Sequence, residues 1–154
     1  PSTSAEMYEH WLANFWVVLA TLVSVGACVL IHYEGLTLVS RALARRHESE
    51  RRRKVLYGIL GVLALHIVEI WLFGLTFFGL LMLPDTGAVT GAHPLGLFDA
   101  VYLASMCYTT VGFGDVSPVG PIRFLAGTSA LTGFVMITWS ASFTFLEMER
   151  FWRR

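Results

Sequence analysis

The stretch Thr109-Thr110-Val111-Gly112-Phe113-Gly114-Asp115 is the part of the chain that decides its fold. Within it, Gly112 and Gly114 alternate with Val111 and Phe113. Glycine adopts positive φ angles without steric cost, whereas an ordinary L-residue resists them. The alternation therefore predicts an extended loop in which successive backbone carbonyls point the same way, as a close stack of oxygens.

An apolar segment from Leu97 to Tyr108 precedes this loop, with a length of about three helical turns. It is too short to cross a bilayer, but it suits a half-helix that enters the membrane and returns. Asp99 lies in its first turn, near the positive end of the helix dipole. Non-helical backbone persists at membrane depth only where it is buried in protein or lines a watery path. A re-entrant element beside a pore is therefore predicted.

Three longer apolar stretches surround this element: Trp11 to Tyr33, Val55 to Leu83 and Pro121 to Phe145. Each exceeds the roughly 20 residues that a helix needs to cross a bilayer core. The whole chain is 55% hydrophobic and 14% charged, with a mean hydropathy of +0.62, which excludes a soluble domain. We predict an all-α membrane protein with three transmembrane helices and a re-entrant pore helix. Pro121 is expected in the first turn of the third helix, where its missing N–H is not needed.

The basic residues predict the orientation of the chain. Every Lys and Arg except Arg123 lies between the first two spans or after the third. The positive-inside rule therefore places residues 34–54 and the C-terminus in the cytoplasm, and the N-terminus outside. Three spans require the two ends to lie on opposite sides, in agreement with the charges. We expect a multi-pass protein of the plasma membrane.

Residues 55–147 resemble the pore domain of the potassium-channel superfamily, with the signature at 109–115 and Phe113 where many members have Tyr. The extra N-terminal span makes the chain similar to small prokaryotic channel proteins with one pore loop. The resemblance implies these parts: an extracellular N-terminus and extra helix (1–33), a basic cytoplasmic linker (34–54), an outer helix (55–83), a turret and pore helix (84–108), a filter (109–115), an inner helix (121–147) and a cytoplasmic tail (148–154).

The resemblance implies that K⁺ is bound by the backbone carbonyls of Thr110, Val111, Gly112 and Phe113, and by the Thr110 hydroxyl at the inner end. The side chains of Val111 and Phe113 would then wedge the strand against the half-helix. One chain supplies one strand, and a ring of carbonyls needs four. The implied protein is a homotetrameric channel that conducts K⁺ passively, with K⁺ as the permeant ion and no cofactor.

Residues next to the ion-binding positions are expected to support them. Tyr102 lies where an aromatic residue of the pore helix often bonds the filter aspartate, here Asp115. Met106 lies where some members place a Glu that pairs with that aspartate, so this second brace is missing. The predicted filter-supporting residues are Thr109, Gly114, Asp115 and Tyr102.

His66 and Glu69 lie three residues apart on one face of the second span. A charged side chain at the bilayer centre costs about 2.5–3.5 kcal/mol, so Glu69 needs a buried partner or a proton. One hypothesis is a proton sensor coupled to the gate. The one we favour is a polar clamp that bonds the pore helix, or Trp139 and Ser140 of the third span. A metal site built from His32, His66 and Glu69 is disfavoured, because spacing alone does not gather these residues.

Two further features each have two readings. Gly133 lies where many superfamily members keep a hinge glycine, and it equally suits close packing between helices. The basic segment Arg41 to Lys54 either binds anionic lipid heads or only sets the topology. It is not a voltage sensor, because its arginines lie outside an apolar span.

Five acidic residues are expected on the outer side of the membrane and would concentrate cations at the outer mouth of the pore. They are Asp85, Asp99, Asp115, Glu6 and Glu9.

Competing functions remain beside selective K⁺ conduction. One is a pore with weak selectivity among monovalent cations, and the other is a non-conducting membrane assembly or sensor subunit. An enzyme is not expected, because the acidic residues and histidines show no nucleophile–base pairing. No nucleic-acid partner is expected either.

Overall fold

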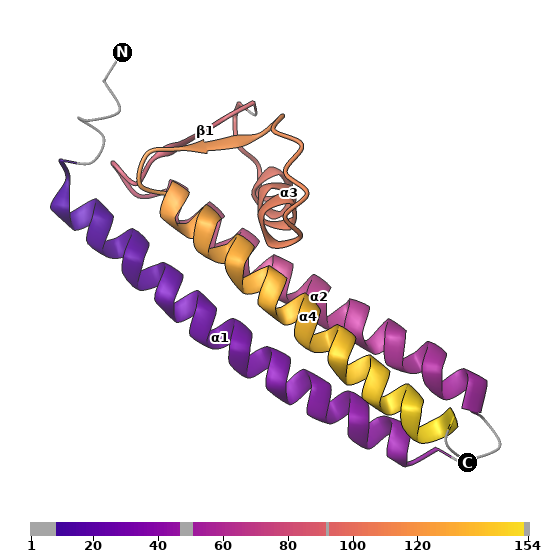
Figure 1. Ribbon diagram of the computed structural model, residues 1–154. Helices are drawn as coiled ribbons and strands as arrows, with labels where there is room; N and C mark the ends of the chain where they lie inside the picture. Colours follow the sequence, from indigo (N-terminus) through magenta and orange to yellow (C-terminus); the bar gives the residue numbers. More distant parts are fainter. Residues whose placement is uncertain (1–8, 47–50, 92, 153–154) are drawn as a thin grey trace.

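Three long helices run side by side in the computed structural model, which describes residues 9–46, 51–91 and 93–152 (Figure 1). A short helix and two short strands lie at one end of them. The elements are α1 (Trp11–Ala44), α2 (Arg51–Leu81), β1 (Ala88–Thr90), α3 (Leu97–Tyr108), β2 (Ser117–Val119) and α4 (Arg123–Trp152). The three long helices are apolar enough to cross a membrane. The predicted all-α membrane architecture is therefore confirmed.

The extra helix α1 packs along both α2 and α4, and α3 packs against α2 and α4. α1 and α2 run in opposite directions, because His10 lies 3.7 Å from Asp85 at one end of the pair. Midway, the hydroxyls of Ser24 and Thr76 share a hydrogen bond of 2.7 Å. The first span is thus joined to the pore-forming part along its length.

The first two helices extend further into the basic segment than the sequence indicates. α1 continues past Tyr33 to Ala44, and α2 begins at Arg51 rather than Val55. Leu36 and Leu43 explain the longer α1, because both are buried at 5% exposure. An apolar stripe therefore continues beyond the membrane-length segment. Most of the predicted linker 34–54 is helical, and its residues 47–50 lie outside the described part of the chain.

α4 begins at Arg123, so the expectation that Pro121 lies in its first turn is wrong. The amides of Arg123 and Phe124 donate to the carbonyls of Gly120 and Pro121, at 3.1 and 3.0 Å, and form a turn before the helix. The Ile122 amide also donates to the Thr86 carbonyl at 2.9 Å. This bond ties the start of α4 to the segment between α2 and β1. α4 then continues beyond Phe145 into the predicted tail.

A short antiparallel sheet joins the segments before and after the pore helix, a feature that the sequence did not indicate. Val89 of β1 lies opposite Pro118 of β2. Proline cannot donate a ladder hydrogen bond, which a two-stranded sheet tolerates because each strand has a free edge. The sheet holds the turret segment beside the end of the predicted filter.

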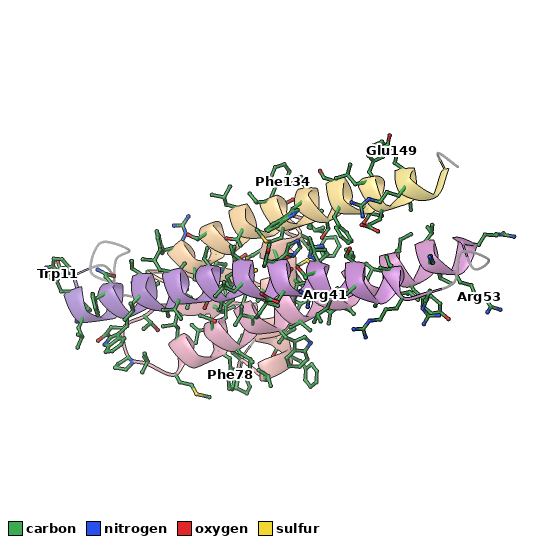
Figure 2. The ribbon with its side chains drawn as sticks, turned by 90° about the horizontal axis from the view of Figure 1, so that it is seen from below. Trp11, Arg41, Arg53, Phe78, Phe134 and Glu149 are labelled. Carbon is green, nitrogen blue, oxygen red and sulfur yellow. The ribbon has the colours of Figure 1, made fainter. Side chains whose placement is uncertain are left out.

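The packed core lies where α2, α3 and α4 meet. Phe73 and Phe77 of α2, Leu103 of α3 and Leu125 of α4 are at most 2% exposed. On the outside, large apolar side chains project away from the helices, as Phe134 does in Figure 2. Phe134 is 58% exposed. An apolar exterior of this extent is expected where hydrocarbon chains or neighbouring subunits replace water.

Candidate functional site

The pore helix α3 has the bounds that its sequence predicts, Leu97–Tyr108. At its start, the Gly96 amide donates to the Asp99 carboxylate at 2.8 Å. At its end, the Thr109 amide and hydroxyl both donate to the Ser105 carbonyl, at 3.0 and 2.7 Å. Both ends of α3 are therefore closed by hydrogen bonds, and the loop begins at Thr109.

The loop after α3 alternates in backbone conformation. Thr110, Gly112 and Gly114 have φ angles of 60°, 54° and 81°. The alternation predicted at the two glycines is present and begins one step earlier, at Thr110. A β-branched residue rarely adopts positive φ, and such strain gathers at functional sites.

The direction of two loop carbonyls follows from the hydrogen bonds of the loop. The Thr110 amide donates to the Cys107 carbonyl at 3.0 Å, and the Gly112 amide donates to the Met106 carbonyl at 3.3 Å. In a trans peptide the C=O points opposite to the N–H of the same unit. The carbonyls of Thr109 and Val111 therefore point away from α3, toward the open side of the loop.

The side chains of the loop are not covered by the chain's own pore helix. Val111 is 53% exposed and Phe113 is 74% exposed. Within one chain these side chains are therefore not packed against the half-helix, and the expectation that they wedge the strand against a half-helix stays a prediction. The bonds from Thr110 and Gly112 to α3 are made by their backbone amides, so the side chains of Val111 and Phe113 need another surface to cover them.

Tyr102 and the turret hold the outer end of the loop. The Tyr102 hydroxyl lies 2.9 Å from each carboxylate oxygen of Asp115 and donates to this group. This is the contact that the resemblance implied. Desolvation, together with the hydrogen bond and charge of Asp115, raises the pKa of Tyr102, so the phenol keeps its proton. Gly91 has a φ of 94°, and a Cβ there would lie 1.9 Å from the Asp115 carbonyl oxygen.

A buried polar cluster lies at the inner end of the loop. The Tyr108 hydroxyl donates to the Glu69 carboxylate. His32 Nδ1 lies 2.7 Å from one carboxylate oxygen of Glu69, and His66 Nδ1 lies 3.0 Å from the other. Ser140 Oγ lies 3.4 Å from His32 Nε2. We call these five residues the Glu69 cluster.

The partners of His66 and Glu69 differ in part from those predicted. The pore helix is one of them, through Tyr108, as one form of the clamp requires. Trp139 and Ser140 instead contact His32, whose ring centroid lies 4.9 Å from that of Trp139. The sequence could not show this arrangement, because it does not reveal which face α1 turns toward α2. His32 within an apolar span was the available signal.

The structure also corrects the expectation that His32, His66 and Glu69 are not gathered. Their ligand atoms all lie within 4.8 Å of one another. However, the N–O distances of 2.7 and 3.0 Å are those of hydrogen bonds. Ligand atoms about 2.0–2.1 Å from a tetrahedral zinc ion stand about 3.3 Å apart. The geometry favours a hydrogen-bonded cluster.

Gly133 lies where α4 approaches the end of the pore helix. A Cβ at this position would meet the Tyr108 carbonyl oxygen at 2.0 Å and the carbonyl carbon at 2.7 Å. Both are backbone atoms that no side-chain rotation can move. Gly133 was expected to serve either as a hinge or for close packing between helices. The structure shows the close packing, between α4 and the end of α3.

Several charged groups outside the Glu69 cluster lie toward the two ends of the helices. Figure 2 shows Trp11 near one end, with Arg53 and Glu149 near the other. Arg41 and Arg150 line one groove at the Arg53 end. Asp85 lies beside His10, at the opposite end. Glu6, Arg153 and Arg154 lie outside the described residues.

Comparison with known proteins identifies the class of this chain. The family model described as "Ion channel" matches residues 65–150, which is more than half of the chain. The chain therefore belongs to this ion-channel family, and its resemblance to the potassium-channel superfamily is confirmed. It is a multi-pass membrane protein that contains an ion-channel domain.

Two curated relatives share part of the sequence, and both are named Protein LctB. The protein from Geobacillus stearothermophilus is 34% identical over 67 residues, covering 44% of this chain and 50% of the relative. The protein from Bacillus caldotenax is 45% identical over 40 residues, covering 26% and 30%. This chain thus spans half or less of the relatives it matches. No solved structure matches.

Proposed function

We propose that this subunit forms a homotetrameric channel that conducts K⁺ passively and selectively. One observation carries the proposal: φ is positive at Thr110, Gly112 and Gly114, while the Thr110 and Gly112 amides turn toward α3. This arrangement directs the carbonyls of Thr109 and Val111 to the open side of the loop. Closely spaced carbonyls can replace the water shell of a dehydrated cation.

The proposed ion ligands are the carbonyls of Thr110, Val111, Gly112 and Phe113, with the Thr110 hydroxyl at the inner end. Tyr102, Asp115, Thr109 and Gly114 support them. The negative end of the α3 dipole, at Tyr108, favours a cation beneath the loop. K⁺ is the permeant ion and no cofactor takes part.

Two kinds of uncovered groups in the single chain support a tetramer: the loop carbonyls and the exposed apolar side chains near them. A single loop offers carbonyls on one side only, whereas an ion needs a ring of them. Val111, Phe113 and Phe98 are 53%, 74% and 76% exposed in the isolated chain. In the proposed assembly, neighbouring subunits cover these apolar side chains.

The proposed membrane is the plasma membrane, with the N-terminus outside and the C-terminus in the cytoplasm. The positive-inside rule supports this orientation, because Arg41 and Arg150 lie together at one end of the helices. The segment Arg41 to Lys54 would meet anionic lipid heads at the inner surface.

Reconstitution into liposomes tests the proposed function. We expect a K⁺ flux that Ba²⁺ blocks and a reversal potential that follows the K⁺ gradient, with Na⁺ strongly disfavoured. Equal K⁺ and Na⁺ fluxes would instead indicate a weakly selective cation channel. No flux from a well-formed tetramer would indicate a non-conducting assembly.

A glycine substitution tests the proposed backbone geometry. Gly112→Ala should abolish K⁺ flux, because the residue has a φ of 54°, which an L-residue resists. The subunit should still fold, because a Cβ at this position would meet nothing within 4 Å in its own chain. Gly26→Ala is the matched control, since its Cβ also meets nothing and its φ is not positive. We expect flux from Gly26→Ala at the wild-type level. An unchanged flux in Gly112→Ala would contradict the carbonyl geometry.

A further inference from the structure

All four helices of the described chain contribute to the Glu69 cluster. His32 comes from α1, His66 and Glu69 from α2, Tyr108 from α3 and Ser140 from α4. The side chains of His32 and Glu69 are fully buried, and that of His66 is 14% exposed. Tyr108 is also fully buried. Such a cluster is costly in a membrane interior unless its groups satisfy one another.

The hydrogen-bond donors of the cluster converge on the Glu69 carboxylate. An ionised carboxylate only accepts hydrogen bonds, and three groups converge on Glu69: the Tyr108 hydroxyl and Nδ1 of His32 and His66. With N–H at Nδ1, His32 accepts from the Ser140 hydroxyl through Nε2. Among the described residues, no buried side-chain nitrogen or oxygen lacks a partner. The buried polar atoms of the cluster are therefore all hydrogen-bonded.

Tyr108 links this cluster to the loop. Its hydroxyl is bonded to α2, through Glu69. Its carbonyl is in close contact with α4, because Gly133 leaves no room even for a methyl group. Its ring packs against Phe73, with 6.2 Å between centroids. The residue that follows it, Thr109, begins the loop.

We infer that the Glu69 cluster is the inner anchor of the selectivity loop, with Tyr108 and Glu69 as positioning residues. His32 brings the extra helix α1 into the same anchor. This inference rests on the proposed function, and it gives α1 a task in ion selection. The loop is then held at both ends, by Tyr102 and Asp115 outside and by Tyr108 and Glu69 inside.

Selective conduction requires that both ends of the loop be held in place. The carbonyls of the loop replace water only if their spacing is maintained. Loss of the Tyr108 hydroxyl leaves a buried carboxylate short of one donor and frees the end of α3 to shift. A buried group that loses its partner changes an equilibrium by roughly 5- to 150-fold. We expect the K⁺/Na⁺ permeability ratio to fall by about tenfold, at the lower end of that range.

The test compares Tyr108→Phe and Glu69→Gln with wild type in proteoliposomes at one pH, after each tetramer has been purified by size. Tyr33→Phe is the matched control, because Tyr33 follows His32 on α1 and is 57% exposed. We expect a lowered permeability ratio in both cluster variants and a wild-type ratio in Tyr33→Phe. The double variant should be no worse than Glu69→Gln alone, since that substitution already alters the bond to Tyr108.

The extra helix is tested by two variants at one position. His32→Leu removes the donor to Glu69 and should lower the permeability ratio, whereas His32→Gln retains an amide donor and should restore part of it. A rescue of this kind distinguishes a hydrogen-bonding role from one of packing alone.

Amide hydrogen exchange provides a readout that does not depend on conduction. In detergent-purified tetramers, the Thr110 and Gly112 amides should exchange faster in Tyr108→Phe than in wild type or Tyr33→Phe. If the wild-type protein showed no K⁺ selectivity, the proposed function would be contradicted. The inner anchor would then be judged by the difference in amide exchange between Tyr108→Phe and wild type. If Tyr108→Phe does not assemble, Glu69→Gln is used for the same comparison.

Three results would overturn the inference. The first is a wild-type permeability ratio together with wild-type loop exchange in tetrameric Tyr108→Phe and Glu69→Gln. The second is an unchanged ratio with a shifted pH midpoint of flux in Glu69→Gln, which would indicate a proton sensor. The third is stoichiometric Zn²⁺ in wild type that is lost in Glu69→Gln, which would make these residues metal ligands.

Discussion

Single residues determine how closely the segments around the loop approach one another. Gly91 and Gly133 each stand against a backbone carbonyl, of Asp115 and Tyr108 respectively. Any side chain there would displace an end of the α3–loop segment. These two contacts depend on the absence of a Cβ rather than on a side-chain bond.

Gly133→Ala should destabilise the tetramer by about 1–3 kcal/mol, the usual cost of overpacking. The reason is the 2.0 Å approach of its Cβ to the Tyr108 carbonyl oxygen. Thermal unfolding measures the loss, with Gly127→Ala on the same helix as the control, because its Cβ meets nothing within 4 Å. Unchanged stability with altered channel opening would support the hinge reading instead.

Tyr102→Phe should speed the decay of K⁺ current, because it removes the hydroxyl that bonds both carboxylate oxygens of Asp115. The brace needs a protonated phenol, and desolvation together with Asp115 raises the pKa of Tyr102 above its ordinary value of about 10. The stabilisation is therefore fully present below pH 10 and is lost as the pH rises beyond it. We expect a constant decay rate from pH 7 to 9 in wild type. A steep change within this range would contradict the assignment.

At the scale of elements, the pore helix was the most predictable part. Its apolar run lies between turn-forming residues and the glycine-alternating loop, so local sequence alone fixed Leu97 and Tyr108 as its ends. The lengths of α1 and α2 were less predictable, because tertiary burial of Leu36 and Leu43 extends α1. The pairing of β1 with β2 was missed, since three-residue strands lack a periodic pattern.

Asp99→Ala should weaken the start of the pore helix. It removes the 2.8 Å bond from the Gly96 amide and the favourable charge at the helix dipole. Capping contacts of this kind contribute about 0.5–2 kcal/mol. Amide exchange of residues 97–101 should rise relative to wild type, with Asp85→Ala as a control outside α3. Equal exchange in the two variants would argue against the cap.

At the scale of the whole molecule, only part of the Glu69 cluster could be predicted from the sequence. His66 and Glu69 could be paired from their spacing within one helix. His32 and Tyr108 could not be added, because that required the packing of α1 and α3 against α2. The loop residues were recognisable from their order, whereas the exposure of Val111 and Phe113 depends on what surrounds the chain.

The central claim is that main-chain oxygens of four loops surround a dehydrated K⁺ on a common axis. Anomalous scattering from crystals of the assembled protein soaked in Tl⁺, a K⁺ substitute, tests it most directly. The account predicts a row of peaks on the fourfold axis, bordered by the carbonyls of Thr110, Val111, Gly112 and Phe113. Loops that do not meet on an axis, or an axis without ion peaks between these carbonyls, would contradict it.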